Sequence, residues 1–339
     1  MNILGMTYEE LVEAIKKLGI ERYRADQILD WLYKKHVFVF EEMTNISKQH
    51  RQLLRENFSV PLPEIITKRV SSLDSTTKYL YRLEDGNTIE SVLLFHEGYA
   101  TACISTQVGC PVKCAFCATG QSGFVRNLSA SEIVSQVLAI ETDSKQIVRN
   151  IVYMGMGEPL LNYENVLKSI RILIHEKTKN LGVRRITIST VGIPDKILRL
   201  AEEGLDLNLA ISLHAASDEK RDKIIPMNKK YSIEEVLHAA KLYQEKSDRR
   251  VTIEYILIKE FNDFDEDARR LARLLSGMKV FVNLIPINPV VSGLEKPTQW
   301  KINRFKELLI DHGIEAEVRY EKGADIEAAC GQLRIRNLH

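Results

Sequence analysis

The first seventy residues have the spacing of amphipathic helices. Apolar side chains recur every three or four positions, at Leu11, Ile15, Leu18, Ile28, Leu29 and Leu32. Thr7 and Glu10 have the spacing of a capping box, in which each side chain satisfies a backbone amide at a helix start. The helical pattern breaks at Pro61-Leu62-Pro63. We therefore expect residues 1–70 to form a small helical accessory domain.

The period changes to that of strands after about residue 78. Tyr79–Leu83 and Ile89–Phe95 flank the turn sequence Asp85-Gly86-Asn87, and this arrangement predicts a β-hairpin. We assign residues 71–99 to a hairpin extension that leads into the main domain.

From residue 100 onward, apolar strand segments alternate with helical segments. The predicted strands are Ala100–Ser105, Asn150–Met154, Arg185–Thr190, Asn208–Leu213, Thr252–Ile258 and Val280–Ile285. Strands separated by helices pair in parallel through right-handed crossovers. Six such units fall short of the eight in a complete barrel. We therefore expect an α/β fold, a partial (β/α)6 barrel over residues 100–313, followed by a C-terminal strand and cysteine-bearing segment over residues 314–339.

Composition limits the classes of protein to consider. The chain has 339 residues, of which 45% are hydrophobic and 27% charged, as in ordered globular proteins. No apolar run is long enough to cross a membrane, and the start does not resemble a signal peptide. We therefore expect a cytoplasmic protein that does not bind membranes.

Charge excludes one mode of nucleic-acid binding. The 47 basic and 46 acidic residues give a net charge of +1, so the chain does not bind through bulk positive charge. Local basic clusters could still contact phosphates, and they comprise Lys177, Lys179, Arg184, Arg185, Lys220, Arg221, Lys223, Lys229 and Lys230.

The cysteines carry the strongest chemical signal. Cys110, Cys114 and Cys117 form a CxxxCxxC run directly after the first predicted barrel strand. Three thiolates this close together suit an iron–sulfur cubane with one iron left open. The alternatives are a zinc site that takes a fourth ligand such as His96, and cysteines that are simply buried. An odd total of five cysteines argues against a disulfide framework.

The segments that follow the predicted strands carry unusual residues. Gly155-Met156-Gly157-Glu158-Pro159 follows the second barrel strand, and Ser212-Leu213-His214 ends the fourth. Because parallel strands bind ligands at their carboxyl ends, these loops and the cysteine loop are expected to meet at one mouth. Glycine in the first loop lets backbone carbonyls approach an ammonium group closely.

Together these motifs resemble the radical S-adenosylmethionine superfamily, which combines CxxxCxxC with a GGEP-like loop. Three further segments resemble the RlmN/Cfr family of RNA methyltransferases over nearly the whole chain. They are Cys103–Cys110, Gly123–Leu128 and Asp325–Leu333.

The resemblance implies a role for each matching residue. It implies one [4Fe–4S] cluster on Cys110, Cys114 and Cys117. It implies that S-adenosylmethionine contacts Gly157, Glu158, Ser189, Ser212, Leu213, His214 and Asn288. Cys330 would carry the methyl group, Cys103 would form a transient disulfide with it, and Glu90 would accept a proton.

The implied reaction is methylation of carbon 2 of adenine in 23S ribosomal RNA and in tRNA, with two S-adenosylmethionine molecules per turnover. This carbon is electron-poor, so a thiolate first accepts the methyl group. The segment from Gln107 to Cys110 resembles the carbon-2 branch of the family. The alternative is the carbon-8 branch, whose members tend to have Cys where Val108 stands.

The resemblance also implies partners. We expect an electron donor such as flavodoxin, a monomeric chain, and an N-terminal helical segment that docks RNA. Two rival interpretations remain at this point: a zinc-stabilised RNA-binding protein without catalysis, and a radical enzyme with an unrelated substrate.

Overall fold

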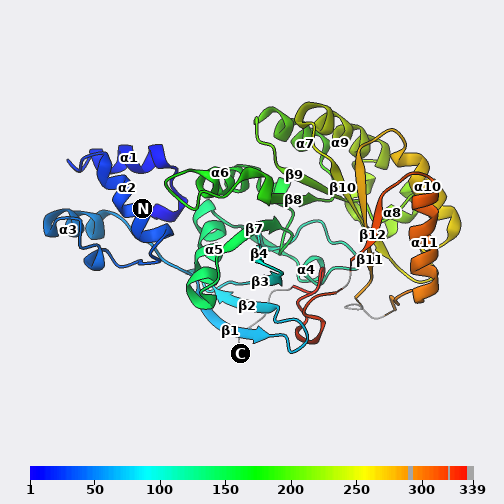
Figure 1. The fold of residues 1–339 in the computed structure, drawn as a ribbon, viewed down its shortest axis with the longest axis horizontal. Helices are drawn as coiled ribbons and strands as arrows, with labels where there is room; N and C mark the ends of the chain where they lie inside the picture. The colour runs from blue at the N-terminus through cyan, green and yellow to red at the C-terminus, as the bar shows by residue number, and fades with distance from the viewer. Residues whose placement is uncertain (289–292, 320, 334–339) are drawn as a thin grey trace.

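The N-terminal part is helical, as its periodicity predicts. The computed structural model describes residues 1–288, 293–319 and 321–333. Its first three α-helices are α1 (Tyr8–Lys16), α2 (Tyr23–Tyr33) and α3 (Lys48–Asn57) (Figure 1). The predicted capping box is present, because Thr7 Oγ1 accepts from Glu10 N and the Glu10 carboxylate accepts from Thr7 N. The apolar positions of these helices belong to the same hydrophobic core as the sheet that follows.

Ten strands form one continuous sheet. In chain order its strands are β1 (Glu64–Val70), β2 (Thr77–Arg82), β3 (Thr88–His96), β4 (Tyr99–Cys103), β7 (Val148–Tyr153), β8 (Ile186–Thr190), β9 (Asn208–Ser212), β10 (Val251–Leu257), β11 (Val280–Pro286) and β12 (Ala316–Val318). From β4 to β12 neighbouring strands run parallel, whereas β1, β2, β3 and β4 pair in antiparallel fashion. The partial barrel with six parallel units is confirmed, and β12 adds a seventh parallel strand.

Residues 64–70 differ from the helical expectation. They form the strand β1 at one edge of the sheet, paired with β2. Most of its side chains are exposed, so the segment has no apolar alternation that would have revealed a strand.

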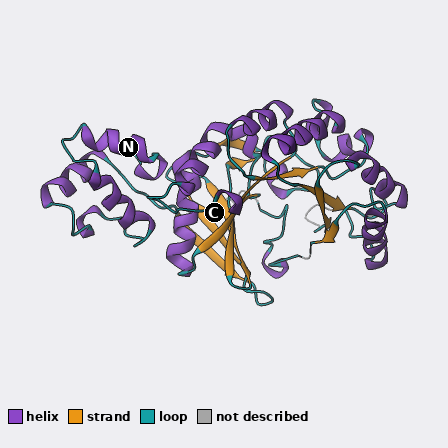
Figure 2. Cartoon of the chain, turned by 45° about the horizontal axis from the view of Figure 1, so that its top comes forward, coloured by secondary structure: helices purple, strands orange, loops and turns teal. Residues whose placement is uncertain are grey.

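Helices cover the outer face of the sheet. They are α5 (Ala130–Ser144), α6 (Tyr163–Ile174), α7 (Pro194–Glu202), α8 (Asp218–Ile224), α9 (Ile233–Ser247), α10 (Asp265–Leu275) and α11 (Gln299–Asp311). Figure 2 shows helices following the curve of the sheet. The short helix α4 (Ala118–Gln121) follows the cysteine loop instead, and its Thr119 lines the space inside the sheet. Two short strands, β5 (Gln107–Gly109) and β6 (Phe124–Asn127), form a separate antiparallel pair. No helix among the described residues is both long and apolar enough to span a bilayer.

The sheet curves around an interior space. Alternate residues of β4 (Tyr99, Thr101, Cys103) line one cavity together with residues of β7, β8, β9 and β11. Because side chains alternate between the two faces of a strand, these positions belong to one face. Strands so far apart in the sheet order can share a cavity only if the sheet bends around it. The loops at its carboxyl ends are thereby brought together.

The N-terminal helices are attached to the barrel by specific contacts. Lys168 on α6 forms an ion pair with Glu10 (2.7 Å), and Lys177 forms one with Asp26 (3.2 Å). The ring of Tyr8 stacks on that of His175 with centroids 4.8 Å apart. These contacts fix the orientation of α1 and α2 relative to α6.

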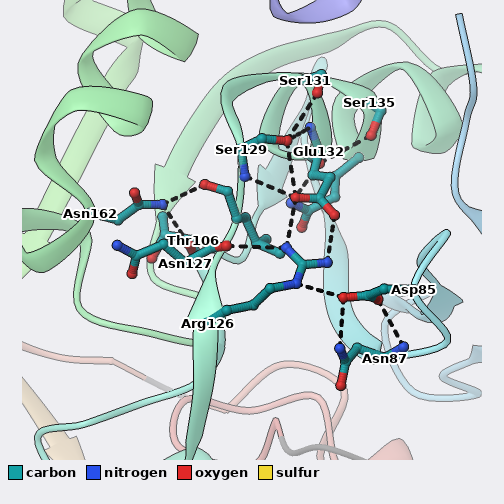
Figure 3. A network of polar contacts seen from close by, with 12 residues as sticks. Asp85, Asn87, Thr106, Arg126, Asn127, Ser129, Ser131, Glu132, Ser135 and Asn162 are labelled. Atoms are coloured by element: carbon teal, nitrogen blue, oxygen red, sulfur yellow. Dashed lines mark hydrogen bonds and ion pairs between the residues drawn. The ribbon is translucent and has the colours of Figure 1, made fainter. Parts of the chain in front are cut away.

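A polar network around Arg126 joins the hairpin to the barrel (Figure 3). Its guanidinium donates to Asp85 in the β2–β3 turn at 2.6 Å and to both carboxylate oxygens of Glu132 at the start of α5. Nearby, the Asn162 amide donates to the carbonyl oxygens of Thr106 and Leu128. These bonds hold the segments on either side of the cysteine loop.

The Arg126–Asp85 pair predicts a pH dependence of stability. Arg126 lowers the pKa of Asp85 from 3.8 to about 2. The folded state therefore favours the ionised carboxylate, so the pair stabilises the protein above about pH 4 and loses this effect as the pH falls toward 2. The Asp85 side chain is 39% exposed, and solvent screening keeps the contribution below about 1 kcal/mol.

Urea denaturation from pH 7 to pH 3 checks this expectation. The midpoint of Asp85→Asn should lie below that of the unchanged protein at pH 7, and the difference should shrink below pH 4. A difference that stays constant down to pH 3 would show that charge does not account for it.

Candidate active site

The three cysteines of the CxxxCxxC run line one cavity at the carboxyl ends of the strands, which we call the inner cavity. The loop that carries them is fixed by backbone bonds from Cys110 N to Gly123 O (2.8 Å) and from Ala115 N to Ile224 O (2.9 Å). Cys114 is buried in a small apolar cluster against α8. The predicted cysteine loop is therefore present, and its thiols face a common space.

Burial of these thiols disfavours their ionised, ligating form. It raises the pKa of Cys110 to about 12 and the pKa of Cys114 well above its ordinary value, and the neighbouring thiols add to both shifts. Three thiolates can share this apolar pocket only if a bound cation compensates their charge. The donor set thus fits a metal centre with thiolate ligands.

The arrangement suits a cluster better than a single zinc ion. In a cubane each thiolate binds a different iron, so the ligands lie further apart than around one ion. His96, the suggested fourth zinc ligand, lines a different cavity and stacks on Tyr99.

Most of the residues expected to contact S-adenosylmethionine line the inner cavity. They are Gly157, Glu158, Ser189, Ser212, His214 and Asn288. Leu213 does not line it, because its side chain is fully buried in the hydrophobic core. Its neighbours Ser212 and His214 line the cavity instead.

The loop after β7 is tightly constrained. Gly157 has a φ of +105°, and a Cβ there would lie 2.6 Å from Cβ of Gln107. The Glu158 carboxylate accepts hydrogen bonds from the backbone amides of Leu160 (3.0 Å) and Val191 (2.9 Å). Glu158 therefore joins the loop after β7 to the loop after β8, and burial raises its pKa.

His214 is a neutral side chain with a defined tautomer. Its Nδ1 accepts from the backbone amide of Ile256 at 3.0 Å, so Nε2 carries the proton. Burial, with a smaller effect of the Arg221 cation, lowers the pKa of His214 to about 3. The Phe116 ring stands edge-on to the imidazole, with ring centroids 4.9 Å apart. His214 thus offers one N–H donor close to the cysteine loop.

Arg221 is a site residue that the sequence interpretation assigned wrongly to a surface cluster. It is only 1% exposed. Its guanidinium donates to the carbonyl oxygens of Leu213, Ser212 and Val191 and to the Asn228 side chain. It therefore holds together the loops after β8 and β9, and it does not contact RNA. A charged residue on a short helix gives no sequence signal for this role.

A second, larger cavity lies inside the curved sheet, and we call it the outer cavity. Its volume is about 450 Å³, and Cys103 lines it from β4. Burial, then the nearby Cys330 thiol, raises the pKa of Cys103 to about 12. Cys330 lines both cavities. The two cysteines that the resemblance pairs are thus brought to the same space.

The segment that carries Cys330 is fastened on both sides. Asp325 accepts hydrogen bonds from the Ser71 hydroxyl (2.6 Å) and the Ser72 amide (2.9 Å) beyond β1. The Gly331 carbonyl accepts from Ala118 N at 2.7 Å. The rest of the predicted segment, residues 334–339, and residue 320 lie outside the described residues.

Glu90 is not brought to either cavity. It is fully buried on β3, and its carboxylate lies 3.5 Å from Nζ of Lys78. Lys78 also donates to the carbonyl oxygen of Glu327, three residues before Cys330. The expected role of Glu90 as proton acceptor stays a prediction.

The basic clusters differ in their surroundings. Arg184 and Arg185 line the outer cavity. Arg184 also pairs with Asp206 at 3.7 Å, and Arg185 donates to Asn150 Oδ1 at 3.3 Å. Lys220 pairs with Asp267 at 2.7 Å and Lys179 with Glu141 at 2.6 Å, and neither lysine lines the outer cavity. The two arginines are therefore the residues of those clusters that reach the outer cavity.

Comparisons with known proteins agree with this site. The family model described as "Radical SAM superfamily" matches residues 104–275. The family model described as "Ribosomal RNA large subunit methyltransferase N-terminal domain" matches residues 1–60. The fold and the cysteine loop thus define a radical S-adenosylmethionine protein with an added N-terminal domain.

Individual relatives narrow the assignment. A "Probable dual-specificity RNA methyltransferase RlmN" of Pseudothermotoga lettingae is 78% identical over 100% of this chain and 98% of its own length. A relative of the same name in Thermotoga petrophila is 63% identical over 99% of this chain and 98% of its own length. The crystal structure of a radical SAM methyltransferase from Sphaerobacter thermophilus superposes with a TM-score of 0.95 at 43% identity, covering 98% of this chain and 99% of that one. The chain therefore belongs to the RlmN family of radical SAM RNA methyltransferases.

Proposed function

We propose that this protein methylates carbon 2 of adenine in large-subunit ribosomal RNA and in tRNA, using a [4Fe–4S] cluster and S-adenosylmethionine. The observation that carries the proposal is the position of Cys330, which lines both the inner and the outer cavity. A thiol at this junction can receive a methyl group on one side and present it to a base on the other. The relatives' names and the full-length match support the substrate class.

The chemistry requires such a thiol. Carbon 2 of adenine has no nucleophilic lone pair, so direct displacement at a sulfonium methyl group fails there, whereas a thiolate accepts the methyl group readily. The cluster and S-adenosylmethionine, when bound, supply the methyl group and the one-electron chemistry. Cys330 then holds the methylene-bridged base, and Cys103 attacks the Cys330 sulfur to release the product and form a disulfide.

The outer cavity suits a single unstacked base. Carbon 2 is poorly reachable within a duplex, so the adenosine must leave its stack to enter. Arg184 and Arg185 bring positive charge to the lining of the outer cavity, where they favour an RNA phosphate. The N-terminal helices provide a second docking surface. The enzyme acts as a monomer in the cytoplasm and receives electrons from a carrier such as flavodoxin.

Nucleoside analysis tests the proposed function. RNA incubated anaerobically with the reconstituted enzyme, S-adenosylmethionine and a reductant should yield 2-methyladenosine on digestion and mass spectrometry. Cys330→Ala should yield none. Formation of 8-methyladenosine instead would favour the carbon-8 alternative. Product formation that survives Cys330→Ala would support a radical reaction that does not pass through this thiol.

A further inference from the structure

A half-buried arginine, with 33% of its side chain exposed, lies where the two cavities meet. Arg319 follows β12, and its backbone amide donates to Leu284 O at 2.8 Å, which continues the pairing with β11. Its side chain lines both the inner and the outer cavity. One Nη atom lies 3.9 Å from the sulfur of Met154 and 3.9 Å from a carboxylate oxygen of Glu254. No motif in the sequence pointed to this residue.

Glu254 supplies the anchor for Arg319. It is 4% exposed on β10 and lines the inner cavity. Its Oε1 accepts from the Asn283 amide at 3.0 Å, while its Oε2, the atom that faces Arg319, has no hydrogen-bond partner. A buried carboxylate oxygen without a partner is costly unless a cation compensates it. This attraction holds Arg319 in place. Because the contact is 3.9 Å long and not bidentate, the guanidinium can still interact with other negative charges.

The guanidinium also interacts with both reactive thiols. Cys330 and Cys103 line the outer cavity together with Arg319. Cys330 is the largest cause of the raised pKa of Arg319, ahead of Glu254, and Cys103 contributes as well. In return, Arg319 lowers the pKa of Cys103, against the larger effect of burial. One cation can therefore interact with the thiolate of Cys330 and with that of Cys103, which react in turn.

We propose that Arg319 is a positioning residue that compensates the thiolate charge first on Cys330 and later on Cys103. This inference rests on the proposed function. In the first step the Cys330 thiol gives its proton to water, and the thiolate attacks the methyl carbon while the carbon–sulfonium bond breaks. In the last step the Cys103 thiolate attacks the Cys330 sulfur and forms an S–S bond, while the carbon–sulfur bond to the product breaks. The electron pair of the broken bond goes to the product carbon, which takes up a proton and becomes the methyl group. Both steps consume a thiolate, so a fixed cation lowers the cost of each.

The other charged groups around Cys330 come from several elements. Glu254 faces it from β10, Cys103 from β4 and Cys117 from the cysteine loop, while Glu321 and Lys322 lie on its own segment. Lys322 donates to Phe95 O, and Glu321 pairs with Lys296 at 3.2 Å. Those two charges are committed to other partners. Among residues 1–288, 293–319 and 321–333, Arg319 and Glu254 form an opposed pair that shares a cavity with Cys330.

The rate of alkylation of Cys330 by iodoacetamide tests this assignment. It is measured from pH 6 to pH 10 on the full-length, anaerobically reconstituted protein, and the Cys330 peptide is followed by mass spectrometry. Arg319→Gln should move the midpoint of the pH profile upward by roughly one unit, because an adjacent positive charge is lost. Arg319→Lys should keep it near the unchanged protein. Glu254→Gln should move it downward, because an adjacent negative charge is lost.

The two variants should move the midpoint of the pH profile in opposite directions. Loosened packing would not produce this difference, so the result distinguishes an effect of charge from an effect of packing. Arg250→Gln is the matched control, since this arginine is 52% exposed and pairs with Glu315 away from the cavities; it should leave the profile unchanged. An unmoved profile in Arg319→Gln, or an upward shift in Glu254→Gln, would overturn the proposal. If Arg319→Gln does not fold, the direction in which Glu254→Gln moves the pH profile decides whether the proposal stands. Failure of the unchanged protein to make 2-methyladenosine would instead overturn the proposed function, whichever way the profiles move.

Discussion

In a Cys103→Ala variant, the methylation reaction is expected to stop with RNA bound covalently to Cys330. Cys103 lines the outer cavity together with Cys330, and it is the thiol best placed to attack the Cys330 sulfur and release the product. Without it, the carbon–sulfur bond to the base has no internal nucleophile that can break it. Turnover should fall by more than about a thousandfold, in the range found when a covalent catalyst loses an essential group. A denaturing gel should show a protein band shifted by the mass of the RNA.

A double variant supplies the control for this experiment. Cys103→Ala combined with Cys330→Ala should give no shifted band, because the residue that forms the bond is absent. Trypsin digestion of the shifted species should leave the nucleotide on the peptide that contains Cys330. Free methylated RNA made by Cys103→Ala at the normal rate would show that the two cysteines do not act as a pair.

Replacing Arg221 with methionine is expected to destabilise the protein by about 3 kcal/mol and to disrupt the inner cavity. Methionine fills a similar volume but donates no hydrogen bonds, so the carbonyl oxygens of Leu213, Ser212 and Val191 lose their buried donor. Each unsatisfied buried acceptor costs about 1–3 kcal/mol, partly offset because the desolvation of the guanidinium is also avoided. Urea denaturation measures the loss of stability, and equilibrium dialysis measures how well the inner cavity still binds S-adenosylmethionine.

The neighbouring lysine gives a matched control. Lys223→Met removes a cation from the same helix, yet Lys223 is 60% exposed and pairs with Glu219, which is 82% exposed. Its loss should cost about 1 kcal/mol or less and leave cofactor binding intact. Equal losses in the two variants would contradict the role of Arg221 as the bond donor that joins the two loops.

Much of the fold could be predicted because its signals are local. The six predicted barrel strands end within two residues of the observed ones, since buried parallel strands have continuous apolar runs. The capping box of Thr7 and Glu10 marks the start of α1 correctly. The strand β1 was missed because its exposed edge has no apolar alternation.

The site was predictable where residues act through their own chemistry. Cysteines at fixed spacing indicate a metal centre wherever the chain places them, and the structure brings Cys110, Cys114 and Cys117 to one cavity. Arg221, Glu254 and Arg319 were not predictable in this way. Their roles depend on which buried carbonyl, carboxylate or thiol the fold sets beside them, and a charged residue in the sequence looks the same whether it is buried or solvated.

The attachment of the N-terminal helices has a consequence for substrate choice. Helices α1 and α2 cannot rotate against α6 without breaking the Glu10–Lys168 and Asp26–Lys177 ion pairs and the Tyr8–His175 stack. If RNA docks on those helices as proposed, it meets the base-accepting cavity at a constant separation and angle. Recognition would then depend on the tertiary shape of the RNA more than on its nucleotide order, and two RNAs of unrelated sequence would be equivalent substrates when they share one local architecture.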